Sequence, residues 1–211
     1  MTEAEWLVCY DPEVMLRHIR KKASQRKLRL FAVACCRQVW HLLNPKHHKS
    51  VGVAERFADG EATVTELRAA HSILLDPYHF THRSEESHAA AFAGYQVAHG
   101  AAYDAARIAA ESARLALPPG DAAAAAQVVL LSDLFGNPFC KARFNKKWRT
   151  TTAVALAKGM YESRDFSAMP ILADALQDAG CDSDDILNHC RDEKATHVRG
   201  CWVVDCVLGK D

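Results

Sequence analysis

Apolar side chains recur every three or four residues along most of the chain, the period of an amphipathic α-helix. Asp11-Pro12 is typical of a helix start, because Asp accepts hydrogen bonds from free backbone N–H groups and proline fits the first helical position. The clearest stripe follows Ser24 and predicts a helix of about 20 residues, ended by Asn44-Pro45. Its apolar members are Leu28, Phe31, Ala32, Cys35, Val39, Leu42 and Leu43.

The remaining helices follow from the same period and from helix-breaking residues. Between Ser84 and Ala126 the chain holds 18 alanines in 43 residues, which favours helix, and Pro118-Pro119-Gly120 splits this stretch into two. The segment 201–207 is rich in β-branched residues. No partner strand is predicted for it, so we expect a last helix, with a short β-like segment as the alternative. Further helices are predicted over 49–58, 65–75, 150–162, 170–179 and 183–191.

The predicted fold class is therefore all-α, an irregular multi-helix bundle. The length of 211 residues fits a single helical domain over 1–211, with 166–211 as a candidate C-terminal sub-module. Apolar residues make up 49% and charged residues 25%, as in ordinary globular chains. No apolar run approaches the roughly 20 residues that cross a bilayer, and the start is acidic where a signal peptide is basic. We expect a cytoplasmic protein without a membrane partner, in which disulfides are disfavoured.

Several separated segments carry a family resemblance. They are MTEAEWLVCYDPEVML, SQRKLRLFAVACCRQVWHLL, LFGNPF, PILADALQDAGCDSDDILNHC and HVRGCWVVDCVLGK. Together they resemble a family of uncharacterised bacterial proteins abundant in planctomycetes. The stretch from Pro170 to Arg191 is also similar to the repeat-companion domain, with Ala175 where that pattern often has Trp. The resemblance implies no catalytic residue; it implies a module found beside signalling or repeat domains, and hence an interaction role.

Cysteine and histidine gather near the C-terminus. Zinc takes four such donors in a tetrahedron, and Cys190, His197 and Cys201 place three of them on one connection between two elements, with Cys181 as the fourth. His189 and Cys206 belong to the same stretch. The alternative is a set of buried thiols, because no C-x₂-C pair is present and apolar residues surround Cys201. Zinc is thus the candidate cofactor, with a structural role of cross-linking the C-terminal segment.

Charge is unevenly distributed although Lys+Arg and Asp+Glu balance at 26 each. Ten Lys and Arg residues and no acid lie between Glu13 and Glu55, and a second basic segment contains Phe144 and Trp148. Such segments can contact phosphates while an aromatic ring stacks on a base. Alternatively they pair with the chain's own acidic region, which has seven acids from Glu162 to Asp185. The candidate nucleic-acid-binding residues are Arg20, Lys21, Arg26, Lys27, Lys146, Lys147, Trp148 and Arg149.

Function classes are narrowed by the motifs that the sequence does and does not contain. There is no Gly-rich phosphate loop and no G-x-S-x-G elbow. A di-iron site in a helical bundle needs two Glu-x-x-His motifs, and the sequence offers only Glu85-x-x-His88. No catalytic residue is therefore predicted. The leading hypothesis is a non-enzymatic helical interaction module that docks a protein partner. The alternative is a nucleic-acid-associated, polyanion-binding protein, and a third is a metal-dependent helical enzyme.

Overall fold

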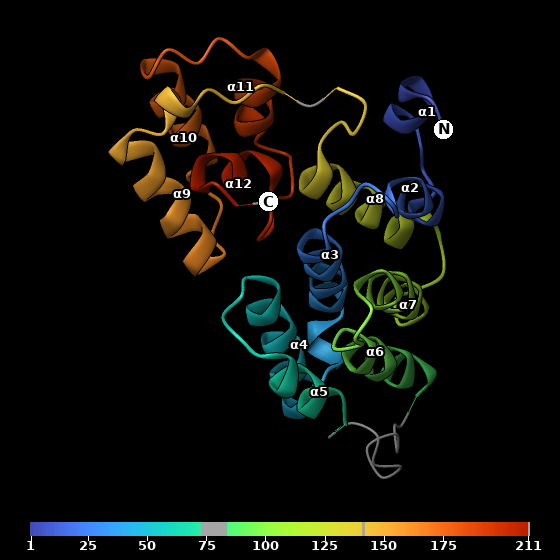
Figure 1. Cartoon of the computed structure of the whole chain (residues 1–211). Coiled ribbons are helices and arrows are strands. Elements are labelled where there is room, and N and C mark those ends of the chain that lie inside the picture. The colour runs from blue at the N-terminus through green and yellow to red at the C-terminus, as the bar shows by residue number, and fades with distance from the viewer. Residues whose placement is uncertain (73–83, 141, 211) are drawn as a thin grey trace. The chain divides into compact units, whose positions relative to one another are not determined.

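The computed structural model describes residues 1–72, 84–140 and 142–210 (Figure 1). Every regular element in these ranges is helical and none is a β-strand, which confirms the predicted all-α class. The chain divides into two compact units within helix α8: an N-terminal unit, Cys9–Val128, and a C-terminal unit formed by Val129–Asp211 together with Met1–Val8. The sequence predicts one domain, and the C-terminal unit begins well before residue 166. No helix in the described ranges combines the length and apolar composition needed to cross a membrane.

The helices of the N-terminal unit begin where the sequence places caps. The Ser24 hydroxyl accepts from the Lys27 amide, and the Asn44 carboxamide oxygen accepts from the amides of Lys46 and His47. Asn44-Pro45 therefore starts a helix as well as ending the stretch before it. The predicted 20-residue helix is shorter, since a 3-10 turn at Trp40–Leu42 follows it. The helices are α2 (Pro12–Ile19), α3 (Gln25–Gln38), α4 (Pro45–Ala58) and α5 (Val64–Ser72); residues 73–75 of the predicted 65–75 helix lie outside the described ranges.

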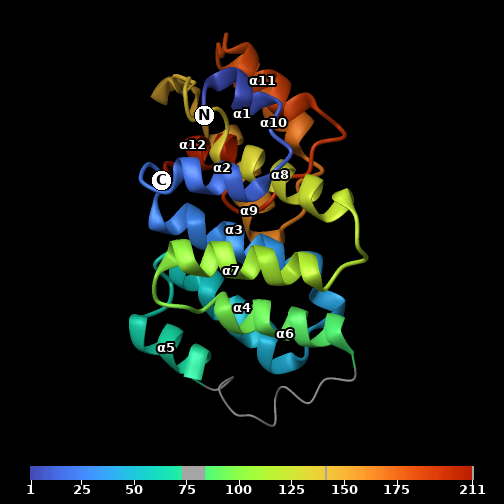
Figure 2. The same ribbon diagram turned by 90° about the vertical axis from the view of Figure 1, so that its right-hand side faces the viewer.

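The alanine-rich stretch forms three helices where the sequence predicts two. They are α6 (Glu85–Gln96), α7 (Ala102–Leu115) and α8 (Asp121–Phe135). Both α3 and α6 pack along α7 (Figure 2), and their small side chains let the backbones approach closely. Helix α6 also approaches α4 closely, since a Cβ at Gly94 would lie 3.0 Å from the His47 Cβ. The unpredicted break follows α6, where the buried Arg29 donates to the carbonyls of Val97, His99 and Gly100.

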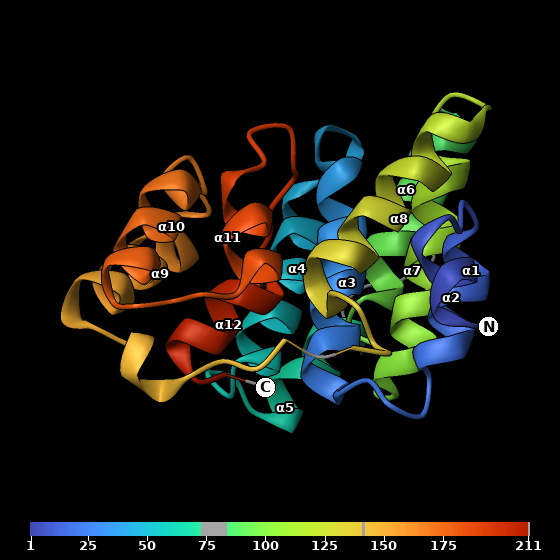
Figure 3. The same cartoon turned by 90° about the horizontal axis from the view of Figure 1, so that it is seen from above.

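The C-terminal unit contains α1 (Glu3–Leu7), the end of α8, α9 (Thr151–Ser163), α10 (Met169–Asp178), α11 (Asp184–Arg191) and α12 (Trp202–Leu208). Its apolar core is formed by residues of α9 to α12 and of the segments next to them. Helix α12 packs against α9 and α11, and α10 packs against both of those (Figure 3). The segment 201–207 is therefore helical and the β-like alternative is wrong. Helical spacing lets Val203, Val204 and Val207 all face the core, and Gly209 ends the helix in a left-handed conformation.

Candidate metal centre

The end of α8 buries a carboxylate among apolar side chains. Leu130, Leu131 and Leu134 are almost wholly buried, and Asp133 lies between them on the helix with 3% of its surface exposed. The helix stops two residues later, because Gly136 takes a left-handed φ of 58° and donates its amide to the Ser132 carbonyl. A buried charge is costly unless it is paired and hydrogen-bonded, so the partners of Asp133 decide what this part of the unit can do.

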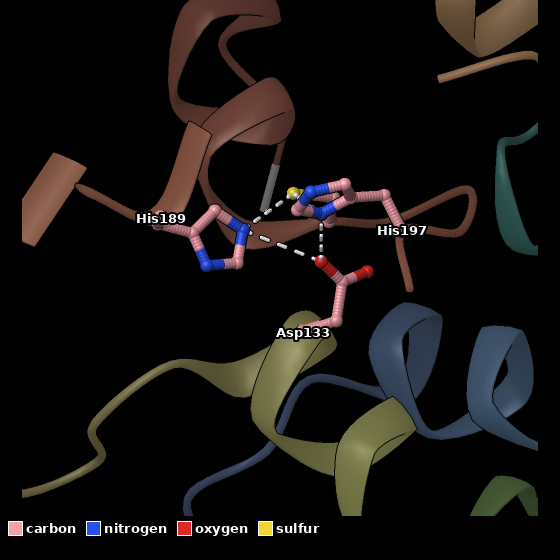
Figure 4. A group of neighbouring side chains, drawn as sticks. Asp133, His189 and His197 are labelled. Atoms are coloured by element: carbon pink, nitrogen blue, oxygen red, sulfur yellow. Dashed lines mark hydrogen bonds and ion pairs between the residues drawn. The ribbon is translucent and has the colours of Figure 1, made fainter. Parts of the chain in front are cut away.

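Three donors from the segment 189–198 satisfy the Asp133 carboxylate, and Figure 4 shows the two that are imidazoles. Its Oδ1 lies 2.7 Å from His197 Nδ1 and 3.3 Å from His189 Nε2, and its Oδ2 accepts from the Val198 amide at 2.9 Å. Burial raises the pKa of Asp133, but the hydrogen bonds and charges of the two histidines outweigh it and hold that pKa below its usual value. The carboxylate thus ties the end of α8 to α11 and to the connection before α12.

A thiol completes the cluster. Cys201 Sγ lies 3.2 Å from His189 Nε2 and 3.9 Å from His197 Nδ1, in a fully buried position at the start of α12. Burial, and next the charge of Asp133, raise the pKa of this thiol well above its usual value. Among the described residues, His197 makes its polar contacts only toward this cluster, because its Nε2 is buried there without a hydrogen-bond partner. A bound cation would reverse the electrostatics of the thiol by favouring the thiolate.

The four donor atoms have the spacing that a small divalent ion requires. All of them lie within 4.8 Å of one another. Bonds of about 2.0–2.3 Å at tetrahedral angles separate zinc ligands by about 3.3–3.6 Å, and the four contacts given above range from 2.7 to 3.9 Å. The remaining two separations, His189 to His197 and Asp133 to Cys201, lie within 4.8 Å, so shifts of roughly one ångström or less would bring all six to the zinc spacing. The residues present therefore fit one tetrahedral ion with an N₂OS donor set.

The sequence-predicted zinc ligands are partly brought together. His197 and Cys201 belong to the four-donor group, whereas Cys181 and Cys190 lie in the apolar core of the same unit and are not among its members. Burial raises the pKa of Cys190 to about 12, as expected for a thiol that packs as a small apolar side chain. His189 lies in the predicted stretch but not in the predicted set, and Asp133 comes from a distant helix. The one signal for Asp133 is an acid inside the apolar run LLSDLF.

In the C-terminal unit, two of the predicted nucleic-acid-binding residues have structural partners. Trp148 is 7% exposed and packs edge-on against Phe144, so its ring is not available for stacking on a base. The Arg149 guanidinium donates twice to the Cys206 carbonyl, at 3.0 and 2.8 Å, near the end of α12. Lys146 and Lys147 are exposed in the 3-10 turn Lys146–Trp148.

In the N-terminal unit, the predicted phosphate contacts lie around the turn between α2 and α3. Arg20 and Lys21 are exposed, and Lys27 is partly exposed on the first turn of α3. Arg26 is paired with the largely buried carboxylate of Asp59 at 3.0 Å. At least one basic residue of this run thus forms an ion pair within its own unit. Polyanion binding stays a prediction.

The cluster lies apart from the open surface of its unit. A hollow of about 630 Å³ runs along the outer side of α9 and is lined by residues such as Thr152, Leu156 and Gly159. None of the four donor residues lines it. Three of the four side chains are at most 5% exposed and that of His189 is 17% exposed, so the cluster is largely closed to solvent, as in a structural metal site rather than a site with an open coordination position.

Comparisons with known proteins add no relative. The chain matches no protein-family model, and neither a curated protein nor a solved structure matches it. The resemblance to the planctomycete family therefore stays a prediction.

The turn after α8 gives a direct test of how this centre is supported. A Cβ at residue 136 would lie 3.3 Å from three atoms of the Trp202 ring, on a backbone with positive φ. We expect Gly136→Ala to lower the free energy of unfolding of the C-terminal unit by about 1–2 kcal/mol. Gly159→Ala is the control, because this glycine lies within helix α9 and a Cβ there would meet nothing within 4 Å. Urea unfolding followed by circular dichroism measures both, and equal stability of the two variants would contradict the expectation.

Proposed function

We propose that the protein is a non-enzymatic helical module whose C-terminal unit is held together by one zinc ion, bound by Asp133, His189, His197 and Cys201. The observation that carries the proposal is the convergence of four donor atoms from α8, α11, the connection after α11 and the start of α12 within 4.8 Å. Imidazole and thiolate donors favour zinc over magnesium or calcium, which prefer oxygen.

A structural role suits the site better than a catalytic one. Four protein ligands leave no position for water or substrate on a tetrahedral ion. His189 has the most exposed side chain of the four, at 17%, while Asp133 and Cys201 are buried. An ion here would cross-link the end of α8 to the 192–201 connection, which has no helix of its own. Docking of a protein partner through the charged surface stays a prediction from the sequence.

Metal content of matched cysteine variants tests the site. Protein purified without a histidine tag is expected to contain one zinc ion per chain by mass spectrometry. Cys201→Ala should lose most of it, because the thiolate is the softest of the four donors. Cys190→Ala is the control: it removes an equally buried thiol of the same core, and we expect it to retain zinc.

Each other result has a defined meaning for this proposal. Loss of zinc from Cys190→Ala as well as from Cys201→Ala would place the ion on the ligand set predicted from sequence instead, because that set contains both thiols. Absence of zinc from the unsubstituted protein after dialysis against micromolar zinc would overturn the metal centre. In that case the cluster would be a hydrogen-bonded core network centred on Asp133.

A further inference from the structure

The ring of His189 is contacted on both of its nitrogens. Nε2 faces Asp133 Oδ1 at 3.3 Å and Cys201 Sγ at 3.2 Å, and Nδ1 accepts a hydrogen bond from the indole Nε1 of Trp202 at 3.2 Å. An indole nitrogen can only donate. The neutral ring must therefore leave Nδ1 bare and carry its proton on Nε2, where that proton points to the carboxylate and the sulfur.

This tautomer opposes metal coordination. Zinc bound at Nε2 requires a lone pair there, so the proton of the neutral ring moves to Nδ1. It would then face the indole N–H, and two donors would meet. Metal-ligating histidines normally donate their second ring N–H to a carboxylate, a backbone carbonyl or water. At His189 a donor occupies that position.

The indole has little room to turn away. The Trp202 ring lies against the backbone of Gly136, at the end of the helix that carries Asp133, and stands 5.2 Å from the His189 ring centroid. Its side chain is partly buried. Binding at Nε2 therefore leaves a donor unsatisfied or displaces a packed indole, and either cost subtracts from the affinity for the ion.

We infer that Trp202 is a positioning residue that sets the tautomer of His189 and thereby holds the zinc affinity of the centre below what its four donors alone would give. The inference rests on the proposed metal centre. It makes the centre a site for exchangeable zinc, which loads when the free ion is abundant and is released when it is scarce, rather than one that holds its ion permanently.

Zinc titration of Trp202→Phe against the unsubstituted protein tests the inference. Phenylalanine keeps an aromatic ring at this position but removes the N–H, so we expect the dissociation constant for zinc to fall about tenfold. Trp40→Phe is the matched control. Its indole also contacts a histidine ring, stacking on His48 with ring centroids 3.9 Å apart, but it lies in the N-terminal unit, and zinc affinity should not change.

A second readout needs no substitution and no zinc. Long-range ¹H–¹⁵N spectra distinguish a bare ring nitrogen from a protonated one, and the His189 signals should show a bare Nδ1 and a protonated Nε2. In Trp202→Phe only the contacts at Nε2 still favour this tautomer, so the share of the Nδ1-protonated form should rise. A protonated Nδ1 in the unsubstituted protein would overturn the inference whatever the variant does.

The two proposals can fail separately. If the unsubstituted protein binds zinc and Trp202→Phe binds it equally or more weakly, the metal centre stands and the role of Trp202 is wrong. If only Trp202→Phe binds zinc, the role of Trp202 is supported and the unsubstituted centre is not a zinc site at the concentrations tested. If neither binds, both proposals are wrong.

Discussion

Chelating zinc from the loaded protein is expected to lower the melting temperature of the C-terminal unit by about 10–20 °C. At a free zinc concentration one hundred times the dissociation constant, binding to the folded state alone contributes about 2.7 kcal/mol. One kcal/mol shifts the melting temperature of a unit of this size by about 4–8 °C. Differential scanning calorimetry with and without EDTA measures the shift.

The chelated unit should stay folded below this lower transition. Without an ion, the Asp133 carboxylate still accepts from two imidazoles and the Val198 amide, and the apolar core that includes Leu172, Ile186 and Val204 is unaffected. Exchange of the Val198 amide should therefore speed up on chelation while that of core helices changes less. Cys201→Ala is the control, since EDTA should not shift its transition. An unshifted transition in protein shown to have lost bound zinc would contradict a stapling role.

Local patterns account for most of the helices. Ser24 and Asn44 cap α3 and α4, Pro118-Pro119-Gly120 separates α7 from α8, and Gly180 follows α10. These signals act over a few residues, so they can be read without knowing the fold. The helical outcome for Trp202–Leu208 follows from the absence of a predicted partner strand, because an isolated strand has nothing to pair with.

Signals that act across the chain could not be read this way. The break between α6 and α7 contains no proline. It is fixed by Arg29, whose guanidinium donates hydrogen bonds to the carbonyls of three residues that follow α6. The place of Asp133 in the four-donor cluster likewise depends on tertiary contacts. Spacing within the tail identified His197 and Cys201 but could not show that an α8 carboxylate, rather than Cys181 or Cys190, meets them.

The basic pattern shows the same limit. Trp148 and Arg149 match an aromatic-basic pattern for nucleic acid, yet one is buried and the other donates to the Cys206 carbonyl. Composition alone does not distinguish a basic side chain that hydrogen-bonds to a helix end from one that is available to bind a phosphate. Charge reversal at the exposed pair Lys146 and Lys147 is therefore the informative change for the polyanion hypothesis, since both side chains reach solvent.

Arg29→Met is expected to destabilise the N-terminal unit by about 3 kcal/mol or more. The guanidinium is 2% exposed and donates to the carbonyls of Val97, His99 and Gly100 at 2.9–3.0 Å. Burial lowers the pKa of Arg29 to about 10, so it remains charged at neutral pH and its hydrogen bonds are charge-assisted. Methionine keeps the apolar stem but leaves these buried carbonyls without their donor, a cost of about 1–3 kcal/mol for each such group.

Arg107→Met in the same unit is the control, because Arg107 is 41% exposed and pairs with Glu111 on the surface of one helix at 3.5 Å; its loss should cost well under about 1 kcal/mol. Denaturant unfolding of both variants, followed by circular dichroism, gives the two free energies. Zinc content supplies an independent readout, since the hydrogen bonds of Arg29 and its contact with the Phe57 ring lie within the N-terminal unit while all four zinc donors lie in the other. We expect Arg29→Met to retain its zinc under conditions that leave the C-terminal unit folded.

A decrease in the unfolding free energy of less than about 1 kcal/mol for Arg29→Met would mean that water replaces the guanidinium at the end of α6. The break between α6 and α7 would then need another cause.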